Sequence, residues 1–232
     1  MTEKLDLHLP ASSYIVYGSK EPKVVLVQTL DTHEIEGFEH EVELIGEGIG
    51  NDSFAIIGAV IHDWELELMP WADKNVSHRP EVGTGASATL SRLTGEVHDA
   101  VQSLGEKVPM VLGGYSLGGL FSLWAVTQTD MFQAAAGMSP SLWVEGWDEY
   151  TATHQPHVNF AYLSLGDREE KAKRAFLARV GDRVRSEYSL LQQRLGAENT
   201  TLVWNPGNHF QNFLERTADG FVWCSRKLLK RS

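Results

Sequence analysis

The clearest chemical signal in the sequence is a serine held between two glycines. Residues 114–118 read Gly-Tyr-Ser-Leu-Gly, a G-x-S-x-G motif, and they join an apolar run ending at Leu112 to an apolar stretch starting at Leu117. A sharp strand-to-helix turn leaves no space for a Cβ beside the serine, which explains the glycines. The helix N-terminus also favours a developing oxyanion. A glycine-rich phosphate loop is the alternative, but no dinucleotide or P-loop fingerprint is present. We interpret Ser116 as a nucleophile.

A nucleophilic serine needs a histidine base, and the fold in which a G-x-S-x-G motif forms such a strand-to-helix turn places the base after the serine in chain order. Only His154, His157 and His209 follow Ser116. His209 lies in a loop of Pro, Gly and Asn residues between the last expected strand and the last expected helix, where the base belongs. The other two histidines lie in a polar stretch before a strand, which is typical of solvated side chains. We therefore predict that His209 is the base.

Three carboxylates compete for the position of the acid that orients the base. Asp167, Glu169 and Glu170 all follow Gly166, which ends an apolar run. A carboxylate three residues beyond such a glycine has the usual geometry, which favours Glu169. Asp167 and Glu170 remain open as candidates. Whichever two of the three carboxylates are not the acid would lie at a solvated helix N-terminus, where acidic residues are favourable.

Two backbone amides must stabilise the oxyanion. The residue after the nucleophile, Leu117, supplies one of them. The second should come from the turn after the apolar run 24–28, and Leu30 is the predicted donor. The HGGG form of this turn, found in lipases, is absent.

The elements that position these residues alternate between short apolar runs and helix-period stretches. This alternation predicts an α/β fold in which a mostly parallel sheet carries helices on both faces. With the serine motif it indicates the α/β-hydrolase fold, as a single domain over residues 1–232 without a large lid. The expected strands are Tyr14–Tyr17, Val24–Gln28, Phe54–Ile61, Met110–Gly114, Ala134–Met138, Phe160–Leu165 and Thr201–Trp204.

Four stretches between these strands have the pattern of helices. Apolar residues at spacings of three and four, from Leu90 to Leu104, predict one helix that ends at Gly105. The other three stretches are Leu117 to Val126, the highly charged Arg168 to Leu195, and Asn212 to Leu229.

Aromatic residues are frequent in the segments expected above the carboxyl edge of the sheet, where ligands bind. Trp64, Trp71, Trp143 and Trp147 belong to this group. Together they suggest an aromatic-walled substrate pocket, for which we select Trp143, Tyr115 and Trp71; core packing is the alternative.

A second polar cluster contains aspartate, glutamate and histidine between residues 31 and 41. The spacing of its members matches no usual set of metal ligands, so a solvated loop and helix face is the better interpretation. We expect no metal and no other cofactor. The members are Asp31, His33, Glu34, Glu36, His40 and Glu41.

Bulk composition sets the remaining limits. The 232 residues are 42% hydrophobic and 22% charged, with a formal net charge of −11. Such acidity argues against nucleic acid or an anionic membrane as the main partner. The single Cys224 excludes an intrachain disulfide, and the first eight residues lack the pattern of a secretory signal. We expect a cytoplasmic protein without membrane insertion that acts on a small-molecule ester; the oligomeric state is left open.

With these residues in place, most of the chain resembles the esterase family that includes enterochelin-esterase-like, esterase-D-like and mycolyltransferase-like α/β-hydrolases. The resemblance rests on Gly113–Gly119, on Met138-Ser-Pro-Ser-Leu-Trp143, on Leu163–Glu170 and on Asn205-Pro-Gly-Asn-His209. It implies ester or thioester hydrolysis, or acyl transfer, without a cofactor.

The resulting hypothesis is a serine hydrolase that cleaves carboxylic esters through an acyl-enzyme on Ser116. A thioesterase, acyltransferase or peptidase with the same residues is the alternative within enzymes. A catalytically silent hydrolase fold that acts as a binding module is the alternative outside them.

Overall fold

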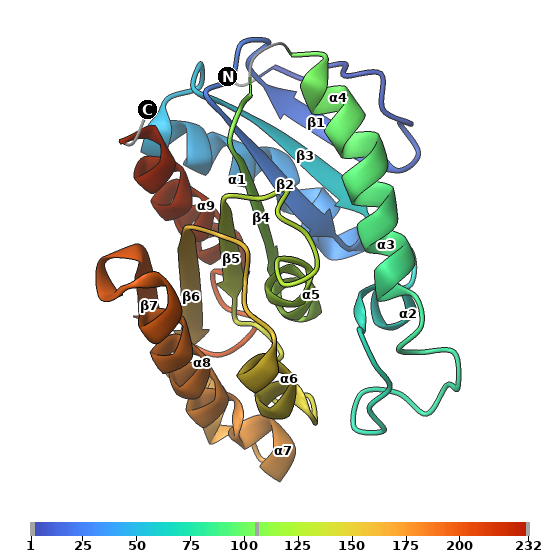
Figure 1. Cartoon of the computed structure of the whole chain (residues 1–232), viewed down its shortest axis with the longest axis vertical. Helices are drawn as coiled ribbons and strands as arrows, with labels where there is room; N and C mark the ends of the chain where they lie inside the picture. The colour runs from blue at the N-terminus through green and yellow to red at the C-terminus, as the bar shows by residue number, and fades with distance from the viewer. Residues whose placement is uncertain (1–2, 105–106, 231–232) are drawn as a thin grey trace.

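A central sheet of seven strands organises the chain in a computed structural model, which describes residues 3–104 and 107–230. The strand order is β1-β3-β2-β4-β5-β6-β7, and every neighbouring pair is parallel except the antiparallel pair of β1 and β3 (Figure 1). The strands are β1 (Tyr14–Gly18), β2 (Val24–Leu30), β3 (Phe54–Val60), β4 (Met110–Tyr115), β5 (Ala134–Met138), β6 (Phe160–Gly166) and β7 (Thr200–Asn205). All seven expected strands are therefore confirmed, each boundary to within two residues.

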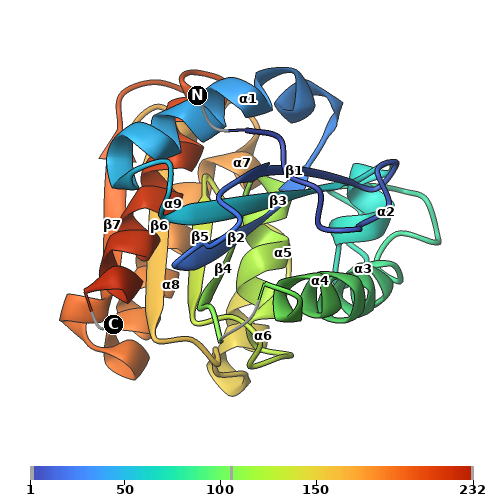
Figure 2. The same cartoon turned by 90° about the horizontal axis from the view of Figure 1, so that it is seen from above.

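Helices cover both faces of this sheet. Figure 2 shows α1 on one side of β1 and β3, with α3 and α4 on the other side. Helix α9 packs beside α1, whereas α5 packs against β4 and β5 and α8 against β6 and β7. The helices are α1 (Thr32–Ile49), α2 (Trp64–Leu68), α3 (Ala86–Arg92), α4 (His98–Gln102), α5 (Leu117–Ala125), α6 (Trp147–Thr153), α7 (Ala175–Ala178), α8 (Val180–Leu195) and α9 (Phe213–Leu229). Among the described residues, no helix is long and apolar enough to cross a bilayer.

The burial of the strands explains their sequences. Every residue of β2, β4, β5 and β6 is buried, as continuous apolar runs in a sheet covered on both faces require. One core layer lies beneath α3, α4, α5 and α8, and the other lies beneath α1 and α9. Parallel strands bring their carboxyl ends to one edge, so the loops after β2, β4, β5, β6 and β7 open on the same side of the molecule.

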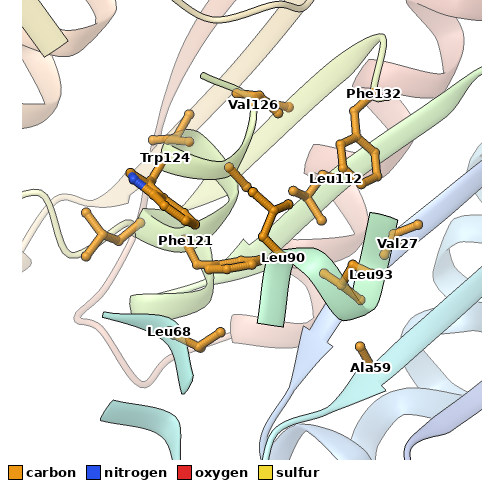
Figure 3. Close-up of a cluster of buried hydrophobic side chains, with 14 of the residues drawn as sticks. Val27, Ala59, Leu68, Leu90, Leu93, Leu112, Phe121, Trp124, Val126 and Phe132 are labelled. Carbon is orange, nitrogen blue, oxygen red and sulfur yellow. The ribbon is translucent and has the colours of Figure 1, made fainter. Parts of the chain in front are cut away.

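The expected helix with apolar residues from Leu90 to Leu104 is continuous but contains one wider turn. A π-helical turn, Leu93–Val97, joins α3 to α4. Its apolar face is buried as predicted, with Leu90 and Leu93 lying among side chains of the sheet and of α5 (Figure 3). The last helical residue is Gln102, and Gly105, the expected end of the helix, lies outside the described residues.

The charged stretch from Arg168 to Leu195 is not one helix, which corrects the sequence prediction. A 3-10 turn, Glu169–Lys171, and the short α7 precede α8, which begins only at Val180. The polar contacts of Glu169 hold the first turn at the edge of the sheet. Helix α8 begins where Val180 and Val184, one turn apart, can both enter the core.

Helix α9 extends along the sheet on the side of α1. Its side facing β5 carries Phe221 and Cys224, both fully buried, and the Cys224 thiol donates a long hydrogen bond of 3.6 Å to the Ala135 carbonyl. Burial raises the pKa of this thiol far above its ordinary value. Near the start of the same helix, Arg216 is buried as well, which brings a charged residue to the edge where the loops meet.

Candidate active site

Ser116 occupies a single-residue turn between β4 and α5. Its backbone angles, φ 55° and ψ −117°, are unusual for a residue with a side chain, as the flanking glycines predict. A Cβ at Gly114 would lie 2.7 Å from the Gly118 carbonyl carbon, and a Cβ at Gly118 would lie 2.5 Å from Thr29 Oγ1. The crowded turn is fixed further by the Ser116 N–H, which donates to the Met138 carbonyl at 3.0 Å.

His209 projects from the loop between β7 and α9. In this loop Gly207 has a φ of 112°, in the left-handed region that favours glycine. The Tyr115 hydroxyl donates to the His209 carbonyl at 2.8 Å, so a residue beside the nucleophile holds the backbone of the histidine. Burial raises the pKa of Tyr115 to about 12, which keeps this hydroxyl a donor at neutral pH.

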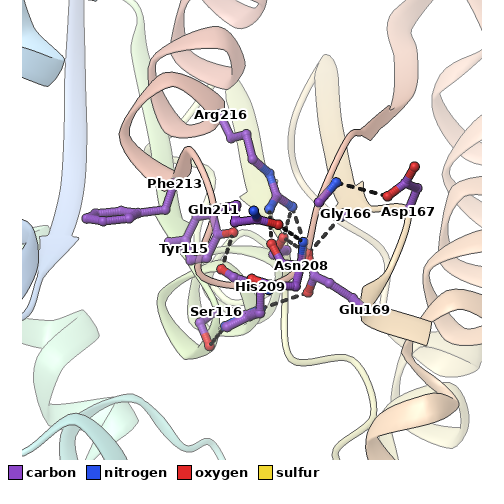
Figure 4. A network of polar contacts seen from close by, with 12 residues as sticks. Tyr115, Ser116, Gly166, Asp167, Glu169, Asn208, His209, Gln211, Phe213 and Arg216 are labelled. Carbon is purple, nitrogen blue, oxygen red and sulfur yellow. Dashed lines mark hydrogen bonds and ion pairs between the residues drawn. The ribbon is translucent and has the colours of Figure 1, made fainter. Parts of the chain in front are cut away.

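The structure brings Ser116, His209 and Glu169 into one hydrogen-bonded chain (Figure 4). Ser116 Oγ lies 3.0 Å from His209 Nε2, and His209 Nδ1 lies 2.7 Å from Glu169 Oε2. Because a carboxylate can only accept, Nδ1 carries the proton and Nε2 presents its lone pair to the serine hydroxyl. This arrangement can remove the proton of Ser116 when the serine attacks an electrophile.

Glu169 is almost completely buried, yet its carboxylate is ionised and fully paired. Oε1 accepts from the Gly166 N–H at 2.7 Å, the Ser139 hydroxyl at 2.6 Å and the Arg216 guanidinium at 2.8 Å. Burial by itself raises the pKa of this carboxyl. The interaction with His209 and the hydrogen bonds from Ser139 and Arg216 outweigh burial and lower the pKa to about 2.

The two competing carboxylates have other partners. Asp167 Oδ1 accepts the Gly207 N–H at 2.9 Å and so ties the loops after β6 and β7 together. Glu170 pairs with Arg185 of α8 at 2.8 Å. Of the three carboxylates left open by the sequence, the structure brings only Glu169 to the histidine. His154 and His157 are exposed and line neither cavity that contains Ser116.

The two predicted oxyanion donors differ in their placement. The Leu117 N–H opens the first turn of α5, where amides have no partner within the helix. The Leu30 carbonyl accepts the Ile61 N–H at 2.9 Å. Since the N–H and C=O of one strand residue point the same way, the Leu30 amide faces β3, away from β4 and Ser116. In this backbone the Leu30 amide therefore does not face the nucleophile. The next amide, that of Asp31, donates to Glu34 Oε2 at 2.9 Å.

Two cavities meet at Ser116. The first, of about 450 Å³, lies toward α1 and α2, and the second, of about 440 Å³, lies toward α7 and α8. Ser116, His209 and Phe210 line both cavities. The first is also lined by Glu34, Trp64, Tyr115 and Phe213, and the second by Trp143, Arg168, Leu177 and Val180. An ester whose carbonyl lies at Ser116 has space for a group on each side.

Of the predicted pocket residues, Tyr115 and Trp143 line these cavities and Trp71 does not. The indole of Trp71 packs against Trp147 and Tyr150 and donates to the Glu145 carbonyl at 2.8 Å. Its aromatic surface packs the segment after α2 against the loop before α6 and against α6 itself.

Sequence reasoning missed two residues at this site. Phe210 is 84% exposed and stands edge-on to the His209 ring between the cavities. Its position next to the predicted base was the available signal. Arg216 contacts Glu169 from α9, and a lone arginine on the buried side of an amphipathic helix could have indicated it.

The acidic cluster that begins at Asp31 serves the start of α1. Asp31 Oδ1 accepts the N–H groups of His33 and Glu34, while the Glu34 carboxylate accepts the Asp31 N–H, which together form a capping box. Glu41 is buried and accepts from the Gln28 amide at 3.3 Å. Across the described part of the chain, no three His, Cys, Asp or Glu side chains are grouped so that they could hold a metal ion.

A mostly parallel sheet with a serine on a strand-to-helix turn at its carboxyl edge is the α/β-hydrolase fold. The family model for esterases, described as "Putative esterase", matches residues 7–197, and the chain therefore belongs to this esterase family. The matched region contains Ser116 and Glu169 and ends before His209. Among curated protein sequences, none matches the chain.

Solved structures with this fold include several serine hydrolases. An IroE-like serine hydrolase from Shewanella oneidensis has a TM-score of 0.71 at 16% identity, over 96% of this chain and 79% of that one. The siderophore hydrolase EstA from Aspergillus nidulans has a TM-score of 0.66 at 16% identity, over 98% and 94%. The enterobactin esterase FES from Shigella flexneri has a TM-score of 0.65 at 12% identity, over 98% and 60%. At these identities the likeness shows the fold alone.

The crowding at the serine turn gives a first test. Gly114→Ala places its Cβ within 2.9 Å of the Gly118 carbonyl and Thr29 Oγ1, so the turn must shift. We expect the free energy of unfolding to fall by about 1–3 kcal/mol, measured by urea denaturation. Gly95→Ala is the matched control, because its Cβ meets open space and a helical alanine stabilises by up to about 1 kcal/mol. Equal effects of both substitutions would contradict the crowding argument.

Proposed function

We propose that this protein is a serine esterase that hydrolyses carboxylic esters through an acyl-enzyme on Ser116. The observation that carries the proposal is the continuous hydrogen-bonded chain from Ser116 Oγ through His209 to Glu169, with distances of 3.0 and 2.7 Å. Membership of the esterase family supports the reaction class.

The first half of the reaction forms the acyl-enzyme. Ser116 Oγ attacks the ester carbonyl carbon while its proton passes to His209 Nε2. The imidazolium is stabilised by Glu169, and the oxyanion accepts a hydrogen bond from the Leu117 N–H at the positive end of α5. When the tetrahedral intermediate collapses, the C–O bond to the alcohol breaks, and His209 returns the proton to the leaving alkoxide.

The second half releases the acid. A water molecule takes the place of the alcohol, gives its proton to His209 and attacks the acyl carbon. The bond to Ser116 Oγ then breaks, the serine recovers its proton from His209, and the carboxylic acid leaves. The two cavities at Ser116 would hold the acyl and alcohol groups. Siderophore esters, and enterobactin in particular, are reasonable first substrates to assay, given that one structural relative is named a siderophore hydrolase and another an enterobactin esterase.

The alternative enzyme activities would use the same Ser116, His209 and Glu169, whereas a binding module would use none of them for chemistry. A thioester or a peptide differs only in the leaving group, and an acyltransferase differs only in the acceptor that replaces water. A silent binding module would not need a serine in a strained turn hydrogen-bonded to a histidine, so the observed geometry argues against it.

Labelling with a fluorophosphonate tests the proposed function without knowledge of the natural substrate. We expect one covalent adduct per chain, located at Ser116 by peptide mass spectrometry, and loss of ester hydrolysis in the same sample. Ser116→Ala should not be labelled, whereas Ser141→Ala, which removes the hydroxyl 3.3 Å from Ser116 Oγ, should still be labelled. A native protein that is folded but unlabelled would favour the silent fold.

The assignment of the acid is tested by a matched pair of amide substitutions. Glu169→Gln replaces an acceptor of the His209 Nδ1 proton with a group that can also donate, so the histidine loses its fixed tautomer. We expect kcat to fall by about 10²- to 10⁴-fold. Asp167→Asn keeps an oxygen for the Gly207 N–H and should have a much smaller effect. A reversed order would make Asp167 the acid.

The second cavity predicts a change in selectivity. Trp143 lines this cavity and packs against Phe176 with a ring-centroid distance of 5.1 Å, so Trp143→Ala enlarges the space available to a substrate. We expect the preference among acetyl through octanoyl esters to shift while turnover of the smallest ester is kept, because a remote contact mainly affects binding. Trp71→Ala is the control outside the cavities. If both variants keep the native profile, Trp143 contributes only packing.

A further inference from the structure

Arg216 is a buried charged residue whose placement beside Glu169 the proposed mechanism does not explain. Its side chain is only 3% exposed. Burying a guanidinium is unfavourable unless it is paired and hydrogen-bonded. The Nη2 atom lies 2.8 Å from Glu169 Oε1 and also contacts the Ser139 hydroxyl, and Nη1 donates to the Asn208 carbonyl at 3.2 Å.

The contacts of Arg216 and His209 fall on different oxygens of the same carboxylate. Arg216 is bonded to Oε1, and His209 Nδ1 is bonded to Oε2 at 2.7 Å. With the Gly166 N–H also on Oε1, the carboxylate cannot rotate about its terminal bond without breaking charge-assisted hydrogen bonds. The plane of the acid, and with it the oxygen offered to His209, is therefore fixed.

The second arm of the guanidinium acts on the base loop. Asn208 directly precedes His209, so the bond from Nη1 to the Asn208 carbonyl holds the backbone of the histidine. The guanidinium carbon lies 5.3 Å from the ring centre of Tyr115, whose hydroxyl holds the His209 carbonyl. The buried guanidinium of Arg216 on α9 thus contacts both Glu169 and the loop that carries His209 (Figure 4).

We propose that Arg216 is a positioning residue that keeps Glu169 ionised and oriented toward His209 and sets the base loop at its working distance from Ser116. The inference rests on the proposed function, because it concerns the same three residues. Arg216 is not among the residues that line either cavity. It reaches the reaction through the residues that it contacts, Glu169, Asn208, Ser139 and Tyr115. Its loss should therefore change the protonation and orientation of the triad and leave substrate binding intact.

The sign of the pH effect follows from the charges around Glu169. The groups that face its carboxylate are His209, Arg216, Ser139 and the Gly166 amide. Without the permanent cation, the pKa of the buried carboxyl rises, since desolvation is then opposed by fewer contacts. The acid limb of the rate profile should then lie at higher pH than in the native protein.

The experiment compares rates of fluorophosphonate labelling and of p-nitrophenyl butyrate hydrolysis between about pH 4 and about pH 9, a range that includes the ordinary pKa values of carboxyl and imidazole groups. For Arg216→Met we expect kcat to fall by about 10- to 100-fold with little change in KM, and the acid limb to move to higher pH. Arg226→Met is the matched control: Arg226 lies on the same helix, is exposed and bonds the Gly48 carbonyl at 2.8 Å. It should lose some stability without any shift of the acid limb.

A double-mutant cycle with Glu169→Gln separates positioning from general support of the fold. If Arg216 acts through Glu169, Arg216→Met should add little to the loss in kcat already caused by Glu169→Gln. A folded Arg216→Met protein with native kcat and a native acid limb would overturn the proposal, as would fully additive losses. Failure of the native protein itself to label at Ser116 would instead overturn the proposed function.

Arg216→Lys covers the case in which the methionine variant does not fold. Lysine keeps the charge but has one nitrogen, which cannot contact both Glu169 and the Asn208 carbonyl as the fork does. We expect its acid limb to stay close to the native position while kcat falls, because the carboxyl keeps a cation and the base loop loses its contact. Native kcat in Arg216→Lys would overturn the positioning role of the fork.

Discussion

The buried negative charge of Glu169 is the constraint on which the arrangement at the sheet edge depends. A carboxylate with little access to water must be paired at each oxygen, or it would take up a proton and lose its attraction for the imidazole. Here the partners come from four places in the chain: the end of β6, the loop after β5, the loop after β7 and α9. The charge therefore joins segments that are remote in sequence, and each of them must be correctly placed before the carboxylate is stable.

The parallel sheet makes this convergence possible. Strands β4, β5, β6 and β7 are neighbours in the order in which they occur in the chain. Each of the loops that follow them therefore emerges beside the next one, at the same edge. Ser116, Ser139, Glu169 and His209 follow these four strands in turn. The site is thus assembled by the topology, and the glycines at the serine turn allow β4 and α5 to approach closely enough to complete it.

The features that sequence could predict are those with a local physical cause. Continuous apolar runs identify buried strands, and the crowding beside Ser116 selects glycine on both sides. The offset of Glu169 from Gly166 is also a local feature: the 3-10 turn after β6 returns the side chain toward the Gly166 amide and the loop of His209.

The features that sequence could not predict depend on direction or on distant partners. The amide of Leu30 points toward β3 because Leu30 is paired with Val60 in the sheet. The amino-acid sequence of a buried strand does not reveal this pairing register. Trp71 packs on Trp147 and Tyr150 from a remote segment, so its aromatic character alone did not distinguish packing from a pocket wall. The charges between Arg168 and Leu195 suggested one surface helix, yet the contacts of Glu169 at its beginning prevent it.

The position of the single thiol has a practical consequence. Cys224 is fully buried between α9 and the sheet, and its raised pKa keeps it in the unreactive thiol form. Maleimides and disulfide reagents therefore reach it only when α9 leaves the sheet. Because α9 also carries Arg216, the rate at which Cys224 becomes alkylated under native conditions measures how often the helix that supports the triad detaches. Local opening of α9 can thus be followed by intact mass spectrometry of Cys224 alkylation, without introducing another cysteine.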